Sequence, residues 1–311
     1  MNAEQLLKQV WINRDLVLRQ NENAPEHLEM LERDYAYAIN AEVSIVLEMN
    51  KALIEVYFNG NYAKAMDISL AAIDKFGKYP YRNALAFHMK MVANSHMHLG
   101  QYDLAKRYLL EAIDTLSPNE DYVANKADML YALAQNEESI NPKSPQMAGY
   151  LQEALSLLED VTDSTRKANC LMGLGNYFIN VENPQEALRY FHEAVLTFEK
   201  KYLLHHMSNT YSNMGTCYLD LKDFERAEEY MQKALDLRLK TSSPDSLAIS
   251  YGNFGVLYLR KGEYDKAEEF LNRSQKIAEE IGFKQLIDRN NDRLHDIGRI
   301  KAELKGVSKA A

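Results

Sequence analysis

Apolar and small residues recur along this chain with two superimposed periods. Within short stretches the spacing is three to four residues, as in Tyr211, Met214, Gly215 and Tyr218, which is typical of one face of an α-helix. The stretch 211–227 then returns forty residues later with Tyr, Asn, Gly, Tyr, an aromatic residue and Ala in the same six places. A fixed period of this size predicts stacked repeats.

Six copies of the repeat share a position that we call the marker. The markers are Leu53, Ala93, Gln135, Gly175, Gly215 and Gly255. Twelve residues after each marker stand Ala65, Ala105, Met147, Ala187, Ala227 and Ala267, and seven further on stand Ala72, Ala112, Ala154, Ala194, Ala234 and Ser274. Each copy predicts two helices, whose axes approach closely where the side chains are small. The third copy alone breaks the first series.

This pattern resembles the tetratricopeptide repeat, with Gly before the turn between the two helices (Gly60, Gly100 and Gly262) and Ala on the second helix. Its period is longer than the basic length of about 34 residues in that family. It is similar to the long-helix arrays of kinesin light chains and bacterial Rap-type peptide sensors. Over residues 43–282, the resemblance implies an all-α fold, a right-handed α-solenoid of about six helix hairpins.

The segments around the repeats do not match them. Residues 1–42 predict two helices that cap the first repeat; the alternative is a docking or dimerisation element with Trp11, the only tryptophan, at the contact. Residues 283–305 predict a capping helix with charged outer faces, which a solenoid end needs to stay soluble. Residues 306–311 predict a tail or linker, unless the helix runs on towards a further domain. The third repeat is predicted either as a drifted copy or as a hinge.

Composition narrows the class of partner. There are 45 acidic and 36 basic side chains, and the net charge of −9 disfavours nucleic acid, which selects for basic surfaces. No apolar run approaches the length of a membrane span. The first residues lack the basic and apolar stretches of a secretory signal, so we expect a cytoplasmic protein with no membrane partner.

Catalytic patterns are missing from the sequence. We find no glycine-rich phosphate loop after a strand, no Cys-x-x-Cys and no His-Glu-x-x-His. His88 and His96 are eight residues apart on one predicted helix, which is too far for one metal ion. We therefore expect no enzyme activity, no cofactor and no metal site.

The resemblance places candidate binding residues on the first helices, which line the concave groove of tetratricopeptide arrays. The candidates are Met91, Asn94, Met97, Asn136, Asn176, Asn180, Asn213, Asn253 and Arg260. An Asn side chain both donates and accepts hydrogen bonds, so it matches one peptide unit of an extended chain. The alternative is that these Asn residues only join neighbouring helices.

Together these patterns predict a non-catalytic scaffold that holds an extended peptide or protein segment in a groove. The alternative is the sensory or regulatory half of a bacterial signalling protein, whose cyclase or transcription-regulator domain lies outside this chain. Protein or peptide partners are expected, and a homodimer through the terminal helices is a further prediction.

Overall fold

The computed structural model describes residues 1–18, 21–118, 122–160, 165–241 and 244–310. Within these ranges the regular structure is helical, with fifteen α-helices, one short 3-10 helix at Ala36–Ala38 and no strand. The α-helices are α1 (Ala3–Leu18), α2 (Ala24–Asp34), α3 (Ala41–Tyr57), α4 (Tyr62–Phe76), α5 (Arg82–His98), α6 (Tyr102–Thr115), α7 (Tyr122–Ile140), α8 (Pro145–Leu157), α9 (Thr165–Asn180), α10 (Pro184–Lys200), α11 (Leu204–Asp220), α12 (Phe224–Thr241), α13 (Pro244–Lys261), α14 (Tyr264–Glu280) and α15 (Lys284–Ala310).

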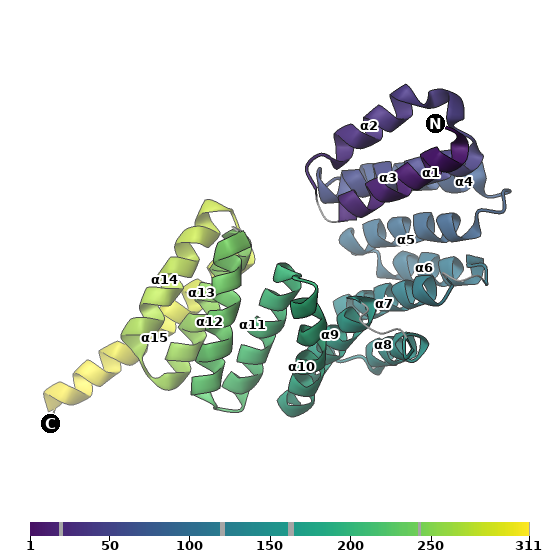
Figure 1. The fold of residues 1–311 in the computed structure, drawn as a ribbon. Coiled ribbons are helices and arrows are strands. Elements are labelled where there is room, and N and C mark those ends of the chain that lie inside the picture. The colour runs from purple at the N-terminus through teal and green to yellow at the C-terminus, as the bar shows by residue number, and fades with distance from the viewer. Residues whose placement is uncertain (19–20, 119–121, 161–164, 242–243, 311) are drawn as a thin grey trace. The chain divides into compact units, whose positions relative to one another are not determined.

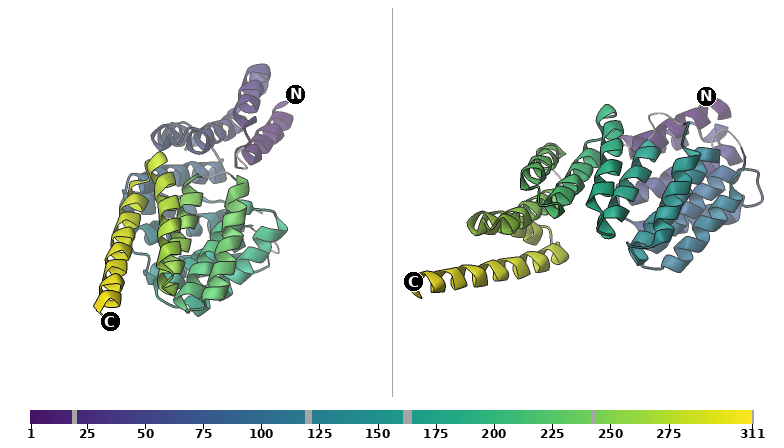
Figure 2. Two further views of the ribbon diagram at one scale, coloured as in Figure 1. Left: turned by 90° about the vertical axis from the view of Figure 1, so that its left-hand side faces the viewer. Right: turned by 90° about the horizontal axis from the view of Figure 1, so that it is seen from below.

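Two compact units divide these helices, at Met1–Asp160 and Val161–Ala311. The amino-terminal unit holds α1, α2 and the hairpins α3–α4, α5–α6 and α7–α8 (Figure 1). The carboxy-terminal unit holds the hairpins α9–α10, α11–α12 and α13–α14, followed by α15; Figure 2 shows both units from two further directions. The predicted all-α solenoid of six helix hairpins is confirmed.

In the carboxy-terminal unit each hairpin closes on the glycine at its marker. A Cβ atom at Gly215 would lie 2.7 Å from Cγ of Met231, and one at Gly255 would lie 2.6 Å from Cγ of Leu271. A Cβ atom at Gly175 would overlap the ring of Phe191 in the same way. The second helix of each hairpin therefore packs so close to the first that no methyl group fits between them.

Stacked ring pairs join the two helices of four hairpins. Their partners stand three and fifteen residues after the marker, with ring centroids 5.3 to 5.5 Å apart and ring planes within 23° of parallel. The pairs are His96–Tyr108, Phe178–Tyr190, Tyr218–Tyr230 and Tyr258–Phe270. Such pairs add about 0.5–1.5 kcal/mol each beyond the burial of their area.

The turn inside five of the six hairpins has a left-handed residue seven positions after the marker. Gly60, Gly100 and Gly262 supply it with φ of 62°, 71° and 77°. Glu182 and Lys222 take the same conformation with φ of 61° in the fourth and fifth hairpins. A residue with a side chain pays roughly 1–2 kcal/mol to adopt this conformation. The fourth and fifth hairpins keep the left-handed turn although Glu182 and Lys222, and not glycine, stand there.

The third hairpin lacks this turn: no residue between α7 and α8 (141–144) has a positive φ, and this connection is one residue longer than that between α5 and α6 (99–101). Helix α7 runs on to Ile140, and its buried positions are shifted by one residue from the predicted register along the helix. Ala134 is 1% exposed, whereas Gln135 is exposed. Ala134 therefore takes the buried small position, and the marker predicted at Gln135 is wrong by one residue.

At the other end of the carboxy-terminal unit, α15 repeats the pattern of a first helix. Ile297 is buried like Leu257, forty residues earlier. Lys301 binds Glu268 at 2.6 Å just as Lys261 binds Glu228 at 3.0 Å. The described part of α15 reaches Ala310, so residues 306–310 continue this helix.

The glycine contact yields a stability prediction. Changing Gly175→Ala should lower the free energy of unfolding by about 1–3 kcal/mol, because the new methyl group overlaps the Phe191 ring. Gly298→Ala on α15 is the matched control, since a Cβ atom there meets nothing within 4 Å. The control should instead gain roughly 0.5–1 kcal/mol from helix propensity. Urea unfolding measures both, and a gain at Gly175 would contradict the packing.

A second prediction concerns pH. His88 on α5 is fully buried, its Nε2 lies 3.2 Å from the carbonyl oxygen of Ile45, and burial lowers its pKa to about 4. Between pH 6.5 and pH 4 the unfolded chain binds a proton that the folded chain does not, so stability falls as pH falls through this window. The loss at pH 5 should be roughly 2 kcal/mol.

The test of this pH effect compares urea unfolding at pH 7.5 and pH 5 for the unmodified chain and for His88→Gln. The glutamine variant lacks the titrating group, so its stability should fall less between the two pH values. Equal falls in both proteins would show that His88 does not carry the effect.

Candidate functional site

The first-helix face of the carboxy-terminal unit is the surface formed by residues two before and one after each marker on α9, α11 and α13. Asn176, Asn213 and Asn253 lie here and are partly buried. The Nδ2 group of Asn213 donates to Oδ1 of Asn176 at 2.8 Å, and Nδ2 of Asn253 donates to Oγ of Ser212 at 3.0 Å. These amides therefore link each first helix to the preceding one in the free chain.

Each of these amides also keeps unused hydrogen-bonding capacity. The Nδ2 group of Asn176 and the Oδ1 atoms of Asn213 and Asn253 bond to no described residue. None of them is among the buried atoms without a partner, so all three atoms reach solvent. A primary amide has two donor hydrogens and two acceptor lone pairs. The face can thus hold its helices together and still offer donors and acceptors outwards.

Two further predicted residues flank this row. Arg260 at the end of α13 is exposed and donates to Oδ1 of Asp220 on α11 at 2.8 Å. Asn180 in the last turn of α9 is partly buried, and its side chain bonds to no residue that the structure describes. Arg260 is therefore already neutralised by an ion pair, whereas the Asn180 amide is open.

Arg238 was missed by the sequence analysis and lies at the edge of this face. It is 4% exposed, and its guanidinium donates to Oγ of Ser250 at 2.7 Å and to Oδ1 of Asn209 at 3.0 Å. Burial lowers the pKa of Arg238, although the nearby carboxylate of Asp245 opposes this shift. The side chain of Arg238, from α12, bonds both to α11 and to α13.

A sequence signal for Arg238 was present. The position twenty-three residues after the original markers is buried in all six hairpins. It is occupied by Phe76, Leu116, Leu158, Phe198, Arg238 and Ala278. One charged residue in an otherwise apolar series indicates a buried cation with dedicated partners.

In the amino-terminal unit the predicted binding residues lie in different environments, some in the core and some nearer the surface. Met91 is 4% exposed and packs in a cluster with Leu53 and Val17, so it belongs to the core and not to an open face. Asn94 and Met97 are partly buried on α5, and the Asn94 side chain bonds to no described residue. These two remain candidates for contact with a partner.

Asn136 requires a correction. It was predicted to point into the groove, but it is 0% exposed, and neither of its amide atoms has a hydrogen-bond partner among the described residues. The reason is the one-residue shift of α7, which turns Asn136 inwards and leaves Gln135 at the exposed position. Gln135 is therefore the amide that α7 presents to solvent.

Trp11 on α1 is 40% exposed. Cζ of Arg14 lies 5.3 Å from the centroid of its ring and 5.6 Å from the ring of Phe87 on α5. The Arg14 side chain thus lies near two aromatic rings from different helices. The exposed tryptophan remains available as a contact.

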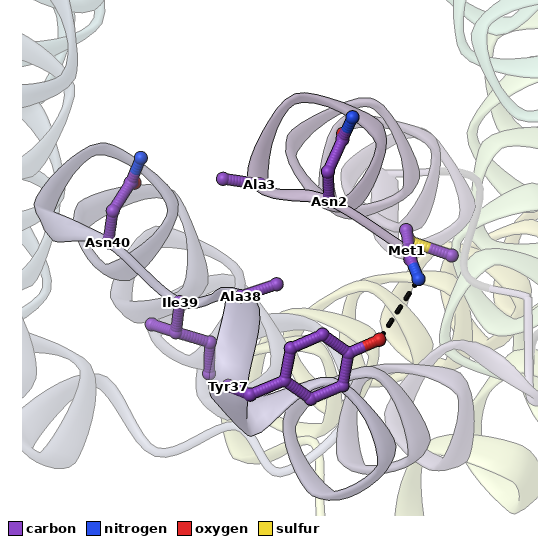
Figure 3. Close-up of a pocket in the computed structure, with 7 residues that line it drawn as sticks. All are labelled: Met1, Asn2, Ala3, Tyr37, Ala38, Ile39 and Asn40. Atoms are coloured by element: carbon purple, nitrogen blue, oxygen red, sulfur yellow. Dashed lines mark hydrogen bonds between the residues drawn. The ribbon is translucent and has the colours of Figure 1, made fainter.

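Hollows elsewhere are shallow. One of about 550 Å³ lies where the start of the chain meets the 3-10 helix, and its seven lining residues appear in Figure 3. The Met1 ammonium donates to the Tyr37 hydroxyl at 3.0 Å across this hollow.

In the part of the chain that the structure describes, no three His, Cys, Asp or Glu side chains are grouped to hold a metal ion. No described helix has the length and apolar content to cross a membrane.

Comparison with sequence families identifies the repeats. Residues 168–206 and residues 206–280 each match a sequence model of the tetratricopeptide repeat. No curated protein matches the sequence. Residues 168–280 of this helical solenoid are therefore similar to tetratricopeptide repeats, as the marker residues predict.

Solved structures with a similar fold come from several systems. A Rap protein complexed with competence and sporulation factor has a TM-score of 0.73 at 16% identity, over 96% of this chain and 87% of that one. BtubC from P. vanneervenii has a TM-score of 0.61 at 18% identity, over 72% and 90%. A signal transduction ATPase from Pyrococcus horikoshii with a tetratricopeptide repeat sensor has a TM-score of 0.74 at 18% identity, over 96% and 45%. These similarities establish the fold.

The Asn176–Asn213 bond predicts a stability effect in the free chain. Changing Asn213→Ala should lower the free energy of unfolding by about 1 kcal/mol, because the bond to Asn176 is lost. Asn94→Ala is the control, since the Asn94 side chain makes no hydrogen bond within the described chain, and its effect should stay within about 0.5 kcal/mol. Urea unfolding of both variants tests the difference, and equal effects would show that the bond contributes nothing.

Proposed function

We propose that this chain binds a peptide or an extended protein segment along the first-helix face of its carboxy-terminal unit, as a non-catalytic scaffold. The observation that carries the proposal is the row formed by Asn176, Asn213 and Asn253. Each has a solvent-reaching amide atom without a partner, on three neighbouring helices. An extended peptide presents N–H and C=O groups in alternation, which such amides can pair one by one.

Apolar side chains beside the amides supply selectivity. Val256 on α13 belongs to the face, Ile179 on α9 stands four residues after its marker, and both are partly buried. Main-chain contacts to the amides would give affinity, and these apolar neighbours would choose among side chains of the ligand. Asn180 extends the row of amides at the end of α9.

Proteins of similar fold support a peptide ligand. The similar Rap structure holds competence and sporulation factor, and NprR, with a TM-score of 0.62 at 12% identity over 96% of this chain and 84% of that one, was solved with its cognate peptide NprX. Peptide binding by those proteins is consistent with the same kind of ligand here.

A second candidate function is the sensory part of a signalling protein. It is favoured by the similar ATPase, whose tetratricopeptide repeat sensor is part of a larger chain, since the matched region spans only 45% of it. On this hypothesis ligand binding to the repeats would control an effector domain. Trp11 remains our proposed contact for such a domain or for a second copy of the chain.

The proposal can be tested by selecting ligands from a displayed library of random twelve-residue peptides on the immobilised chain. The strongest binder is then titrated by fluorescence anisotropy against Asn176→Ala, Asn253→Ala and Glu229→Ala. Each Asn variant should bind about tenfold more weakly, because a bound peptide group loses its partner. Glu229 is exposed on α12 and serves as the control from the second-helix surface.

Two outcomes would contradict this function. In one, Glu229→Ala weakens the selected peptide as much as the Asn variants do. In the other, both Asn variants retain full affinity, which would leave these residues only as links between helices.

A further inference from the structure

Helix α15 contributes its own strip to the first-helix face. Asn290 is fully buried and donates to Oγ of Ser274 at 2.8 Å, Ile297 is 1% exposed, and Lys301 is fixed by ion pairs to α14. These three residues lie on one side of the helix and set its rotation. By the forty-residue register, Arg293 then corresponds to Asn253, and Arg289 corresponds to Ile249.

Two arginines therefore occupy first-helix positions on α15. They are one turn apart, at i and i+4, which places both side chains on the same side of the helix. Arg289 is exposed and donates from Nε to the carbonyl oxygen of Gln285 at 3.2 Å. Arg293 is partly buried and makes no hydrogen bond or ion pair with any residue that the structure describes.

This pair is unfavourable in the free chain. The pKa of Arg293 is lowered by burial and by the positive charge of Arg289. Like charges at i and i+4 destabilise a helix. A partly desolvated cation without a counter-ion lowers the stability of the folded chain further. Asp296 on the same helix is paired with Arg299 at 3.4 Å, and neither Asp288 nor Asp292 forms an ion pair with Arg289 or Arg293 among the described residues.

The charges around the pair favour an anion. Helices α9, α11 and α13 hold two acidic residues, Asp220 and Asp245, and the first of these is paired with Arg260. Helices α10, α12 and α14 hold twelve acidic residues. Arg238 adds a buried guanidinium at the level of Asn209, which corresponds to Arg289 by the register. Acidic charge thus gathers on α10, α12 and α14, whereas α9, α11 and α13 are left nearly free of it; α15 itself carries Asp288, Asp292, Asp296 and Glu303.

We propose that Arg289 and Arg293 form an anion site that receives carboxylate groups of an acidic peptide, at the α15 end of the first-helix face. The proposal rests on the proposed function, because it names the chemistry of the ligand of that same face. Arg pairs carboxylates through two parallel N–H···O bonds, which restores a counter-charge to Arg293. The ligand segment beside α15 is therefore rich in Asp and Glu.

The binding test uses two labelled, amidated probes of defined sequence, (Glu-Gly)5 and (Gln-Gly)5. The unmodified chain should bind the glutamate probe about tenfold more tightly at low salt, and this preference should shrink as salt is added. The double variant Arg289→Gln with Arg293→Gln should abolish the preference. The control, Arg273→Gln on α14, removes an arginine that is ion-paired with Glu269 and should leave the preference intact.

Competition with free tripolyphosphate and with chloride tests whether the site prefers carboxylates to other anions. Competition by excess glutamate probe should release the bound label, whereas chloride at equal ionic strength should release less. A site that binds tripolyphosphate but shows no preference for the glutamate probe would overturn the carboxylate assignment. Equal loss of preference in Arg273→Gln would also overturn it, because the effect would then be one of net charge.

Stability supplies an independent readout. Removing one of two like charges should raise the melting temperature of the free chain, so Arg293→Gln should melt about 1 °C higher than the unmodified chain. A lower melting temperature together with an unchanged glutamate preference would assign Arg293 a structural role and overturn the proposal.

The two proposals can fail separately. If selected peptides depend on Asn176 and Asn253 but bind Arg293→Gln with full affinity, the anion site is wrong and peptide binding stands. If the glutamate probe depends on Arg293 while no selected peptide depends on the Asn residues, the anion site stands and the Asn-based function is wrong.

Discussion

The contact between a marker glycine and a side chain of the second helix is the constraint on which the carboxy-terminal unit depends. At Gly215 and Gly255 there is no space for a methyl group against Met231 and Leu271. Interiors are packed as densely as organic crystals, so such a contact admits little adjustment. One side of each first helix is therefore taken up by the contact with its second helix. The side that is left over faces the neighbouring first helices.

That remaining side is polar, and its polar groups have two roles. The bond between Asn176 and Asn213 joins α9 to α11, while Arg238 bonds to both α11 and α13. The same amides retain free donors and acceptors towards solvent. On the proposal that this face binds a peptide, ligand affinity and folding stability are coupled, because the same amides serve both.

Charge is distributed unevenly along the chain. Residues 1–160 hold 23 acidic and 14 basic side chains, whereas residues 161–311 hold 22 of each. The net charge of −9 thus belongs entirely to the first half of the sequence. A whole-chain value hides this difference, and it also hides that α9, α11 and α13 hold only two acidic residues. An acidic ligand is compatible with that local surface even though the chain as a whole is acidic.

The sequence by itself determined the hairpins, because a glycine or alanine at a helix contact leaves a periodic trace at forty residues. It also located Asn176, Asn213 and Asn253 on one face, since their positions follow from the same register. It could not show that these amides bond to each other, because that depends on the distance between helices far apart in sequence. Likewise, only the tertiary structure showed that the third hairpin lacks the left-handed turn used by the other five, that α7 is shifted by one residue and that Asn136 is buried. A shift of one residue turns a helix by about 100°, and a periodic pattern with one irregular copy does not reveal which residues are turned inwards.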